Sequence, residues 1–176
     1  MAGVFWLFLF FLPAGLANMA PVFANKIPYL NRWKTPMDFG KKFKGKRISG
    51  DNKTWRGLVF GTFVGGLVAC FEAFILFQIS SADTLASYAV VGASMGFGAL
   101  SGDAIESFFK RQMGIKSGES WFPFDQSDYI VGGLAASLLF VRLPLLDYVY
   151  IYLIYFGLHL ATSYIGYKLH LKNKPI

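Results

Sequence analysis

Residues 57–79 read GLVFGTFVGGLVACFEAFILFQI, an apolar run in which Glu72 is the single charged side chain. A bilayer core about 30 Å thick is crossed by roughly 20 apolar residues in a helix, so this run is long enough to span a membrane. Gly61 and Gly65 would let a neighbouring helix approach closely, either within the chain or across a homodimer contact. The run therefore predicts a membrane-spanning helix that packs against other helices.

Four further apolar runs lie at about residues 3–24, 84–101, 129–141 and 145–169. Apolar residues make up 55% of the chain, and its mean hydropathy of +0.45 is too high for a soluble protein of 176 residues. We place a turn between the last two runs because Arg142 and Pro144 disfavour a continuous lipid-exposed helix. The first run is interpreted as a retained helix because no basic segment precedes it, as a cleaved signal would require. The sequence thus predicts an all-α integral membrane protein, a single membrane domain with five transmembrane helices.

The cations are distributed unevenly along the chain. Ten of the seventeen Lys and Arg residues fall within 25–56, three within 102–128 and three near the C-terminus. Five spans would put these segments on one side of the membrane, with only Arg142 on the other. The positive-inside rule then predicts an external N-terminus, a cytoplasmic C-terminus and cytoplasmic loops at 25–56 and 102–128, in a multi-pass plasma membrane protein. The net charge of +7 is assigned to a membrane surface rather than to nucleic acid, since no nucleic-acid-binding motif accompanies it.

The segment SGDNKTWRG, residues 49–57, stands immediately before the first quoted run. Asn52, Lys53 and Thr54 would lie at a helix start, where free backbone N–H groups and the helix dipole favour a phosphate. The same residues also suit a capped helix start with a lysine that reaches the membrane interface. The glycine spacing does not fit a Walker A loop. From these residues alone, both interpretations stay open.

Acidic and basic side chains gather after the third apolar run. Asp103, Glu106 and Lys110 are spaced to lie along one face if the helix continues, although Glu106 and Lys110 would also form an ordinary ion pair on a solvated helix. Asp125 and Asp128 follow, and two carboxylates three residues apart at a helix start can bind Mg²⁺, which prefers oxygen ligands together with substrate phosphate. Helix capping would explain one of these aspartates as well. The two groups together predict a metal site at the membrane boundary and chemistry on a phosphorylated substrate.

Taken together, these motifs resemble the integral-membrane CDP-diacylglycerol synthases, the phosphatidate cytidylyltransferases, and most closely their archaeal branch, CDP-archaeol synthase. The resemblance runs from about Leu12 to Gly133, and the last span matches only in character. The segments that carry it are LPAGLANMAP at 12–21, PMDFGK at 36–41, GDNKTWRG at 50–57, SFFKR at 107–111, GIK at 114–116 and the Asp125–Asp128 pair.

This resemblance implies a CTP-dependent reaction on a membrane lipid phosphate. The lipid, unsaturated archaetidic acid (2,3-bis-O-geranylgeranyl-glyceryl phosphate), would attack the CTP α-phosphate to give CDP-archaeol and pyrophosphate in phospholipid biosynthesis, assisted by Mg²⁺. No general base is needed, because the attacking phosphate is already ionised. The expected partners are CTP, the isoprenoid ether-lipid phosphate and membrane lipids. The residues implied are Asp103, Glu106, Asp125 and Asp128 for the metal, Asn52, Lys53, Thr54, Lys110 and Arg111 for CTP and phosphate, and Asp103, Asp125, Asp128 and Lys110 for catalysis.

The chain departs from the bacterial and eukaryotic members in two places. Those members carry a His-Gly-Gly element before the aspartate pair, whereas here Pro123 and Phe124 lead directly into Asp125. Where those members have Lys-Asp, this chain has Lys116 followed by serine. The two histidines of the chain, His159 and His170, lie in and just after the last apolar run, so we give a histidine no part in the chemistry.

Other classes of membrane protein share some of these features. A small transporter or ion-binding protein would also carry carboxylates, but such sites lie near the bilayer midplane on broken helices. The acidic groups here fall outside the apolar runs, which favours an enzyme with a soluble co-substrate. A CDP-alcohol phosphotransferase is a nearer alternative, but its Asp-Gly…Ala-Arg…Gly…Asp-x-x-x-Asp pattern is absent from this chain.

Overall fold

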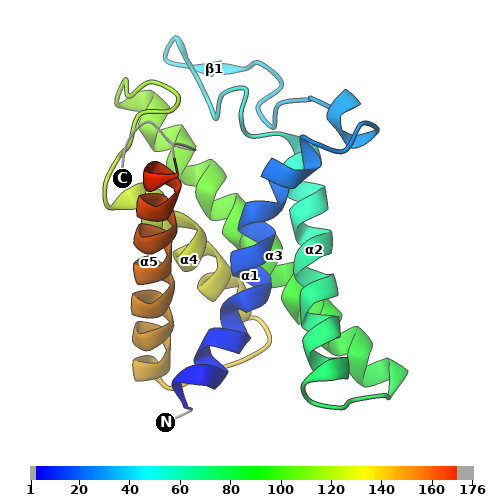
Figure 1. Ribbon diagram of the computed structural model, residues 1–176. Coiled ribbons are helices and arrows are strands. Elements are labelled where there is room, and N and C mark those ends of the chain that lie inside the picture. The colour runs from blue at the N-terminus through cyan, green and yellow to red at the C-terminus, as the bar shows by residue number, and fades with distance from the viewer. Residues whose placement is uncertain (1–2, 170–176) are drawn as a thin grey trace.

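The computed structural model describes residues 3–169 and is built almost entirely of helices (Figure 1). The all-helical class predicted from the sequence is therefore confirmed. A long segment between the first two α-helices carries a short 3₁₀ helix and a small antiparallel hairpin in which Lys42 pairs with Arg47. The described elements are α1 (Val4–Ala24), η1 (Leu30–Arg32), β1 (Lys42–Phe43), β2 (Lys46–Arg47), α2 (Trp55–Ile75), α3 (Ala82–Gln112), α4 (Phe124–Ser137) and α5 (Leu145–Lys168).

Helix α3 is longer than the predicted third span. It continues to Gln112, so the first part of the segment expected to be a loop, residues 102–128, is helical. The sequence explains the extension, because no proline or glycine interrupts residues 103–113 and Glu106 and Lys110 stand one turn apart. The helix ends where Gly114 adopts a φ of 82°, the left-handed conformation that commonly follows a helix C-terminus. This extension carries the acidic and basic side chains out of the apolar part of the bundle.

Helix α4 is shorter than a membrane span. Its 14 residues extend about 21 Å, whereas α1, α2, α3 and α5 are each long and apolar enough to cross a bilayer. Residues 138–144 then run outside helical structure to α5, which begins after Pro144 as expected. The protein is therefore a multi-pass membrane protein with at least four candidate spans. The five-span topology stays a prediction, in which α4 and residues 138–144 together make the fourth crossing.

Small residues bring the helices into direct backbone contact. A methyl group on Gly65 of α2 would lie 2.5 Å from the Gly92 carbonyl oxygen of α3, and one on Gly98 of α3 would collide with the Gly132 carbonyl oxygen of α4. Helix α1 packs against all four of the other α-helices, and its Phe11 is completely buried in the core. These four glycines therefore serve contacts between helices of one chain, and the homodimer stays a prediction.

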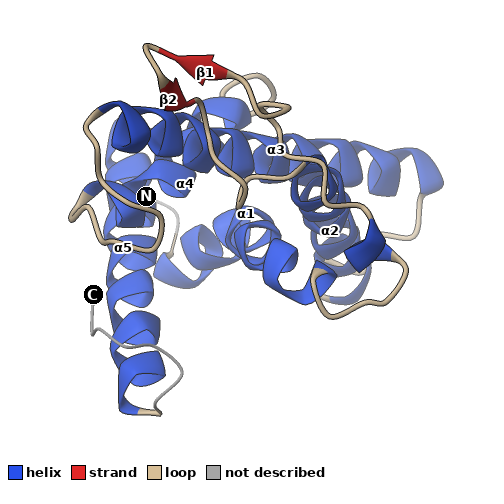
Figure 2. Ribbon diagram, turned by 90° about the horizontal axis from the view of Figure 1, so that it is seen from above, coloured by secondary structure: helices blue, strands red, loops and turns tan. Residues whose placement is uncertain are grey.

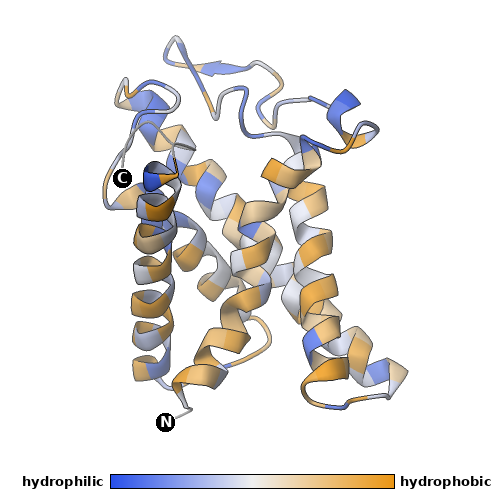
Figure 3. Cartoon of the chain, in the orientation of Figure 1, coloured by the Kyte–Doolittle hydropathy of each residue, from blue (hydrophilic) through white to orange (hydrophobic). Residues whose placement is uncertain are grey.

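The loops that carry most of the cations lie at one end of the bundle. Figure 1 places the α1–α2 segment, the α3–α4 turn and the end of α5 together, and Figure 3 shows this end to be hydrophilic above apolar helices. Seen from that end in Figure 2, the hairpin lies beside α3, against which β2 packs. This is the arrangement that the predicted topology requires. Lys172, Lys174 and His170 lie outside the described residues.

Candidate active site

A polar pocket of about 250 Å³ opens at the loop-bearing end of the bundle. Three parts of the chain build it: the segment before α2, the extension of α3, and the α3–α4 turn with the start of α4. It contains all of the predicted site residues except Thr54. The lining residues are Ser49, Asn52, Lys53, Asp103, Glu106, Ser107, Lys110, Arg111, Ser117, Gly118, Asp125 and Asp128.

Three carboxylates converge at the base of this pocket. Asp103, Glu106 and Asp128 each offer one oxygen, and these oxygens all lie within 4.8 Å of one another. Glu106 is only 8% exposed, and its Oε1 has no hydrogen-bond partner within residues 3–169. Three carboxylates ionised together at this spacing would repel one another, and a cation between them would relieve that repulsion. An all-oxygen donor set of this kind fits a hard divalent cation such as Mg²⁺.

The convergence depends on how closely α4 approaches α3. Asp103 and Glu106 lie on the same face because they are three residues apart in one helix. Asp128 of α4 approaches them next to Gly102 of α3. A side chain at residue 102 would collide with the Asp128 carbonyl oxygen, so the close approach requires glycine there. The Asp128 carboxylate also accepts a 2.6 Å hydrogen bond from the backbone N–H of Tyr129. A glycine at residue 102 is therefore part of how the carboxylates meet.

Asp125 occupies a different position from the other acidic residues. Its carboxylate accepts hydrogen bonds from the Lys110 ammonium group and from the Trp121 backbone N–H, the latter at 2.6 Å. Lys110 is 7% exposed, and its Nζ lies 3.9 Å from Glu106 Oε1. The structure thus groups Glu106, rather than Asp125, with the other two metal-ligand candidates. The assignment of Asp125 as a metal ligand remains a prediction from sequence.

The segment before α2 supplies the opposite wall. Lys53 Nζ lies 2.6 Å from both carboxylate oxygens of Asp103, which is 50 residues away in the chain. Asn52 Nδ2 donates a 2.8 Å hydrogen bond to Ser117 Oγ and so ties this wall to the α3–α4 turn. Arg111 also lines the pocket, and its Nε is buried with no hydrogen-bond partner in the described part of the chain. Basic side chains therefore flank the carboxylates on two sides.

Thr54 is not among the residues that line the polar pocket and caps a helix. It is the N-cap of α2, where its Oγ1 accepts a 3.2 Å hydrogen bond from the Gly57 backbone N–H. A hydroxyl that caps a helix in this way is directed at its own backbone. The helix-capping interpretation of residues 49–57 therefore describes Thr54, while Lys53 lines the polar pocket. The predicted contacts of Lys53 and Thr54 with phosphate stay predictions.

Asp38 holds the segment that carries Lys53, a role that the sequence analysis did not assign. Its buried carboxylate accepts hydrogen bonds from Arg47 Nε and Nη2 at 3.1 and 2.8 Å. The backbone N–H groups of Gly40, Ser49 and Gly50 donate to it at 2.9, 3.0 and 3.0 Å. Burial opposes ionisation, but these bonds from Arg47 and the backbone together hold the pKa of Asp38 well below its usual range. The only signal in the sequence was an aspartate two residues before a glycine in PMDFGK.

This arrangement reaches Lys53 through the backbone. Met37, next to Asp38, donates its N–H to the Lys53 carbonyl oxygen at 2.8 Å, and Trp55 donates to the Thr35 carbonyl oxygen at 3.1 Å. These bonds align residues 35–37 with 53–55 in a short antiparallel pairing. The Asp38 carboxylate therefore fixes the backbone on both sides of the hairpin and, with it, the position of the lysine.

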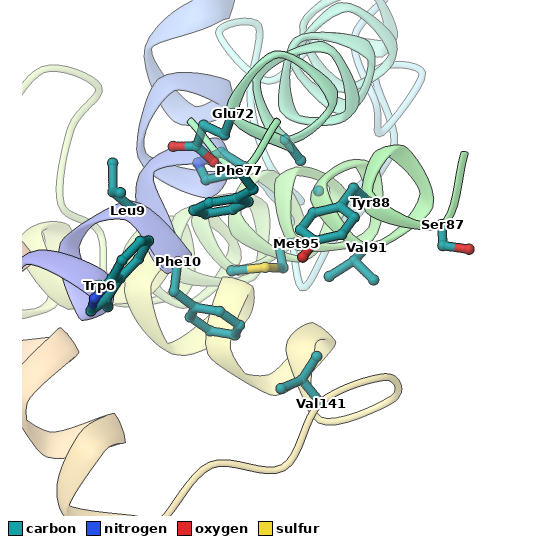
Figure 4. A pocket seen from close by; sticks show the side chains of 13 residues that line it. Trp6, Leu9, Phe10, Glu72, Phe77, Ser87, Tyr88, Val91, Met95 and Val141 are labelled. Atoms are coloured by element: carbon teal, nitrogen blue, oxygen red, sulfur yellow. The ribbon is translucent and has the colours of Figure 1, made fainter. Parts of the chain in front are cut away.

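A larger apolar cavity of about 420 Å³ lies in another part of the bundle (Figure 4). Trp6, Phe77 and Met95 are among its lining residues, and the carboxylate of Glu72 stands at its edge. Among the described residues, none lines both this cavity and the polar pocket, and no Lys or Arg lines the cavity. This cavity lacks the groups that would hold a phosphate.

Comparisons with known proteins agree with one another. A family model described as CarS-like, CDP-archaeol synthase, matches residues 3–176. The CDP-archaeol synthase of Pyrobaculum aerophilum is 33% identical over 169 residues, covering 96% of each chain. That of Saccharolobus islandicus is 35% identical over 173 residues, covering 95% of this chain and 93% of the relative. A solved structure of an intramembrane enzyme for archaeal membrane lipids biosynthesis superposes with a TM-score of 0.76 at 31% identity, covering 92% of this chain and 94% of the other.

Proposed function

This chain belongs to the CDP-archaeol synthase family and is therefore a CTP-dependent cytidylyltransferase of lipid biosynthesis, and we propose that its polar pocket is where the cytidylyl group is transferred. The proposed substrates are CTP and unsaturated archaetidic acid, and the products are CDP-archaeol and pyrophosphate. The observation that carries the assignment is the meeting of Asp103, Glu106 and Asp128 within 4.8 Å, flanked by Lys53 and Lys110.

The residues present fit a bound magnesium ion. Asp103, Glu106 and Asp128 would hold it, because they offer three clustered oxygens, one of them buried and without a hydrogen-bond partner in the described chain. When bound, Mg²⁺ would neutralise charge on the phosphate oxygens as it builds in the transition state. Asp125 would instead orient Lys110, whose ammonium group it contacts.

The basic residues supply the remaining charge neutralisation. Lys53 and Lys110 each contact a carboxylate of the pocket in the structure. When CTP binds beside these carboxylates, its phosphate oxygens would add negative charge, and the two lysines would be close enough to neutralise it. Arg111 can contact a phosphate through two parallel N–H groups, which suits it to a bidentate role. Asn52, held by Ser117, would contact the nucleotide at the rim. These groups act by holding two anions together and by opposing the charge that accumulates.

No histidine of residues 3–169 lines the pocket, and the reaction requires none. An oxygen of the lipid phosphate attacks the α-phosphorus of CTP, and the bond to the β-phosphate breaks with departure of pyrophosphate. Because the nucleophile is already an anion, no proton has to be removed from it. Within residues 3–169, the one histidine is His159, which lies on α5 with its ring 5.8 Å from that of Tyr129. Its position agrees with a role in packing between α4 and α5.

The predicted topology gives this chemistry a location. With the N-terminus outside and five crossings, the polar pocket faces the cytoplasm, where CTP and Mg²⁺ are available. The lipid chains would stay among the exposed apolar side chains of the helices while the phosphate reaches the pocket rim. We place the enzyme in the plasma membrane on the same argument.

Pyrophosphate release by the detergent-purified protein tests the proposal. The assay contains CTP, Mg²⁺ and either 2,3-bis-O-geranylgeranyl-glyceryl phosphate or diacyl phosphatidic acid. We expect release that needs CTP, metal and the isoprenoid lipid together. Release with the diacyl lipid alone would overturn the substrate assignment but keep the chemistry. No release with either lipid, from protein that is folded by circular dichroism, would overturn the assignment of the site.

A further inference from the structure

A largely apolar groove of about 420 Å³ runs along α3 at the same end of the bundle as the polar pocket. This volume lies within the range of about 300–1,000 Å³ in which small-molecule sites are found. One wall comes from the segment between α1 and α2, and the other from α3. The residues that matter for the argument are Met37, Ile48 and Ser49 on the first wall and Ala104, Ile105 and Phe108 on the second.

Two faces of one helix thus carry different chemistry. Ala104, Ile105 and Phe108 follow the three- and four-residue spacing of a single helical face, whereas Glu106 and Lys110 turn into the polar pocket. The apolar face is open at its edge, since Ile105 remains 59% exposed. The extension of α3 therefore separates the acidic and basic groups of the polar pocket from a largely apolar groove, whose opposite wall includes Asp38.

Ser49 joins the two compartments. It lines the apolar groove and the polar pocket alike. Its hydroxyl oxygen is buried and has no hydrogen-bond partner among the described residues. Its backbone is fixed by the hydrogen bond to Asp38, so the side chain is held at this junction. A hydroxyl in this position can donate to an anionic oxygen that passes from one compartment to the other.

We propose that the groove along α3 receives one isoprenoid chain of the lipid substrate and delivers its phosphate to the polar pocket at Ser49. The inference rests on the function proposed above. The substrate combines an apolar chain with a phosphate. The apolar groove would hold the chain, and the polar pocket next to it would hold the phosphate. Burial of a chain against Ile48, Ala104 and Phe108 contributes binding free energy in proportion to the apolar area removed from water.

One cation, Lys46, lies beyond the end of the groove, whereas the charged residue among the described lining residues of the groove is Asp38. Phe43 of β1 contacts the ring of Phe108 at 5.9 Å, which brings the hairpin over the groove wall. Lys46, in the same hairpin, donates a 2.6 Å hydrogen bond to the Gln112 carbonyl oxygen at the end of α3. Cations near a membrane surface attract anionic head groups by about 1 kcal/mol each. The cavity of Figure 4 offers no such route, because none of its lining residues belongs to the polar pocket.

The test fills the groove and compares long and short lipids. Ala104→Trp places an indole in the groove, and Ala86→Trp makes the same substitution at an exposed position of the same helix. Pyrophosphate release is measured with 2,3-bis-O-geranylgeranyl-glyceryl phosphate and with short-chain dihexanoyl phosphatidic acid. We expect Ala104→Trp to raise KM for the long lipid by about tenfold or more, with KM for CTP and the short-lipid kcat/KM within about twofold of wild type. Ala86→Trp should match wild type throughout.

The possible outcomes separate this inference from the proposed function. If Ala104→Trp leaves KM for the long lipid unchanged, or lowers turnover of both lipids equally, the groove does not hold the chain. If the wild-type protein releases no pyrophosphate with any lipid, the proposed function fails and the groove assignment fails with it. Ser49→Ala tests the junction separately, because it should raise KM for both lipids by a similar factor while KM for CTP stays constant. Unchanged lipid KM values in that variant would remove Ser49 from the route.

Discussion

The polar pocket and the apolar cavity each contain a buried glutamate, and the two glutamates have almost the same exposure. Glu106 is 8% exposed and Glu72 is 7% exposed. Glu106 has two further carboxylates within 4.8 Å and Lys110 Nζ at 3.9 Å. Glu72 is surrounded by lining residues such as Phe77 and Met95. If the proposed site is correct, burial alone does not distinguish a functional carboxylate, whereas neighbouring charges and the convergence of a second helix do.

The two glutamates differ in how their surroundings stabilise or destabilise the charge of the carboxylate. A buried carboxylate is costly unless hydrogen bonds, a cation or a metal compensate for it. In the polar pocket the neighbouring carboxylates increase that cost, and the lysines and a bound cation would reduce it. In the apolar cavity no described residue with opposite charge lines the wall. We therefore expect the pocket to bind cations and phosphates and the cavity to bind apolar groups. The predictions below test this contrast, beginning with the largest effect.

Asp128→Asn should have the largest effect. The substitution replaces one of the three converging carboxylates by a neutral amide, whose single oxygen can still accept the Tyr129 N–H bond. We expect kcat for pyrophosphate release to fall by at least about a hundredfold, the scale found when a preorganised electrostatic group is lost. Asp83→Asn, on an exposed position at the other end of α3, is the matched control and should keep wild-type activity. Activity of Asp128→Asn within about twofold of wild type would refute the metal assignment.

Lys53→Met should weaken CTP binding rather than abolish catalysis. The ammonium group lies at the carboxylate cluster and would contact the triphosphate, and a hydrogen bond to a charged group is worth about 1.5–3 kcal/mol. We therefore expect KM for CTP to rise by about ten- to a hundredfold, with KM for the lipid little changed. Steady-state kinetics with each substrate varied in turn will show the difference. Lys42→Met, in the exposed strand β1, serves as control, and an equal rise in that variant would point to a general surface-charge effect instead.

Asp38→Asn tests whether the polar pocket depends on the segment that carries Lys53. The loss of the charge-assisted bonds from Arg47 should lower the free energy of unfolding by about 2 kcal/mol at pH 7 and raise KM for CTP through misplacement of Lys53. Because the pKa of folded Asp38 is lowered, its stabilising contribution is present above about pH 4, the unfolded value, and disappears as the pH falls toward the folded one. The difference in Tm between variant and wild type should therefore shrink below about pH 4.

Asp51→Asn is the matched control for that experiment. Asp51 also pairs with Arg47, at 2.8 Å, but its side chain is 80% exposed. An exposed ion pair contributes little, so this variant should unfold within about 0.5 kcal/mol of wild type. A Tm difference for Asp38→Asn that stays constant from pH 7 to pH 3 would show that the carboxylate charge is not the cause.

Local spacing made much of the fold and the candidate site predictable. Apolar run length indicated α1, α2 and α5 within a few residues, and Pro144 marked the start of α5 correctly. The spacing of Asp103, Glu106 and Lys110 predicted a shared helix face, which the extension of α3 provides. The helix end was underestimated because hydropathy reports where apolar sequence stops, whereas the helix continues until Gly114.

The parts that escaped prediction depend on contacts between distant residues. Nothing local distinguishes Asp38, whose partners Arg47, Ser49 and Gly50 become neighbours only when the hairpin folds back. The position of Asp125 apart from Asp103, Glu106 and Asp128 also escaped prediction, because it depends on the contact of its carboxylate with Lys110 of α3. Thr54 illustrates the converse, since two interpretations fitted the sequence and only the geometry assigned its hydroxyl to the cap.

Glu72→Leu should have the smallest effect on activity and completes the comparison. The Glu72 side chain shares no wall with the polar pocket, and its Oε1 has no hydrogen-bond partner within residues 3–169. Leucine would fill similar volume without an unpaired polar atom, so we expect kcat and both KM values within about twofold of wild type and an unchanged or higher Tm in detergent. Glu106→Leu provides the direct counterpart, because it should lose activity as Asp128→Asn does. If Glu72→Leu reduced kcat as strongly as Glu106→Leu, the apolar cavity would be coupled to the chemistry, and the distinction between the two buried acids would have to be abandoned.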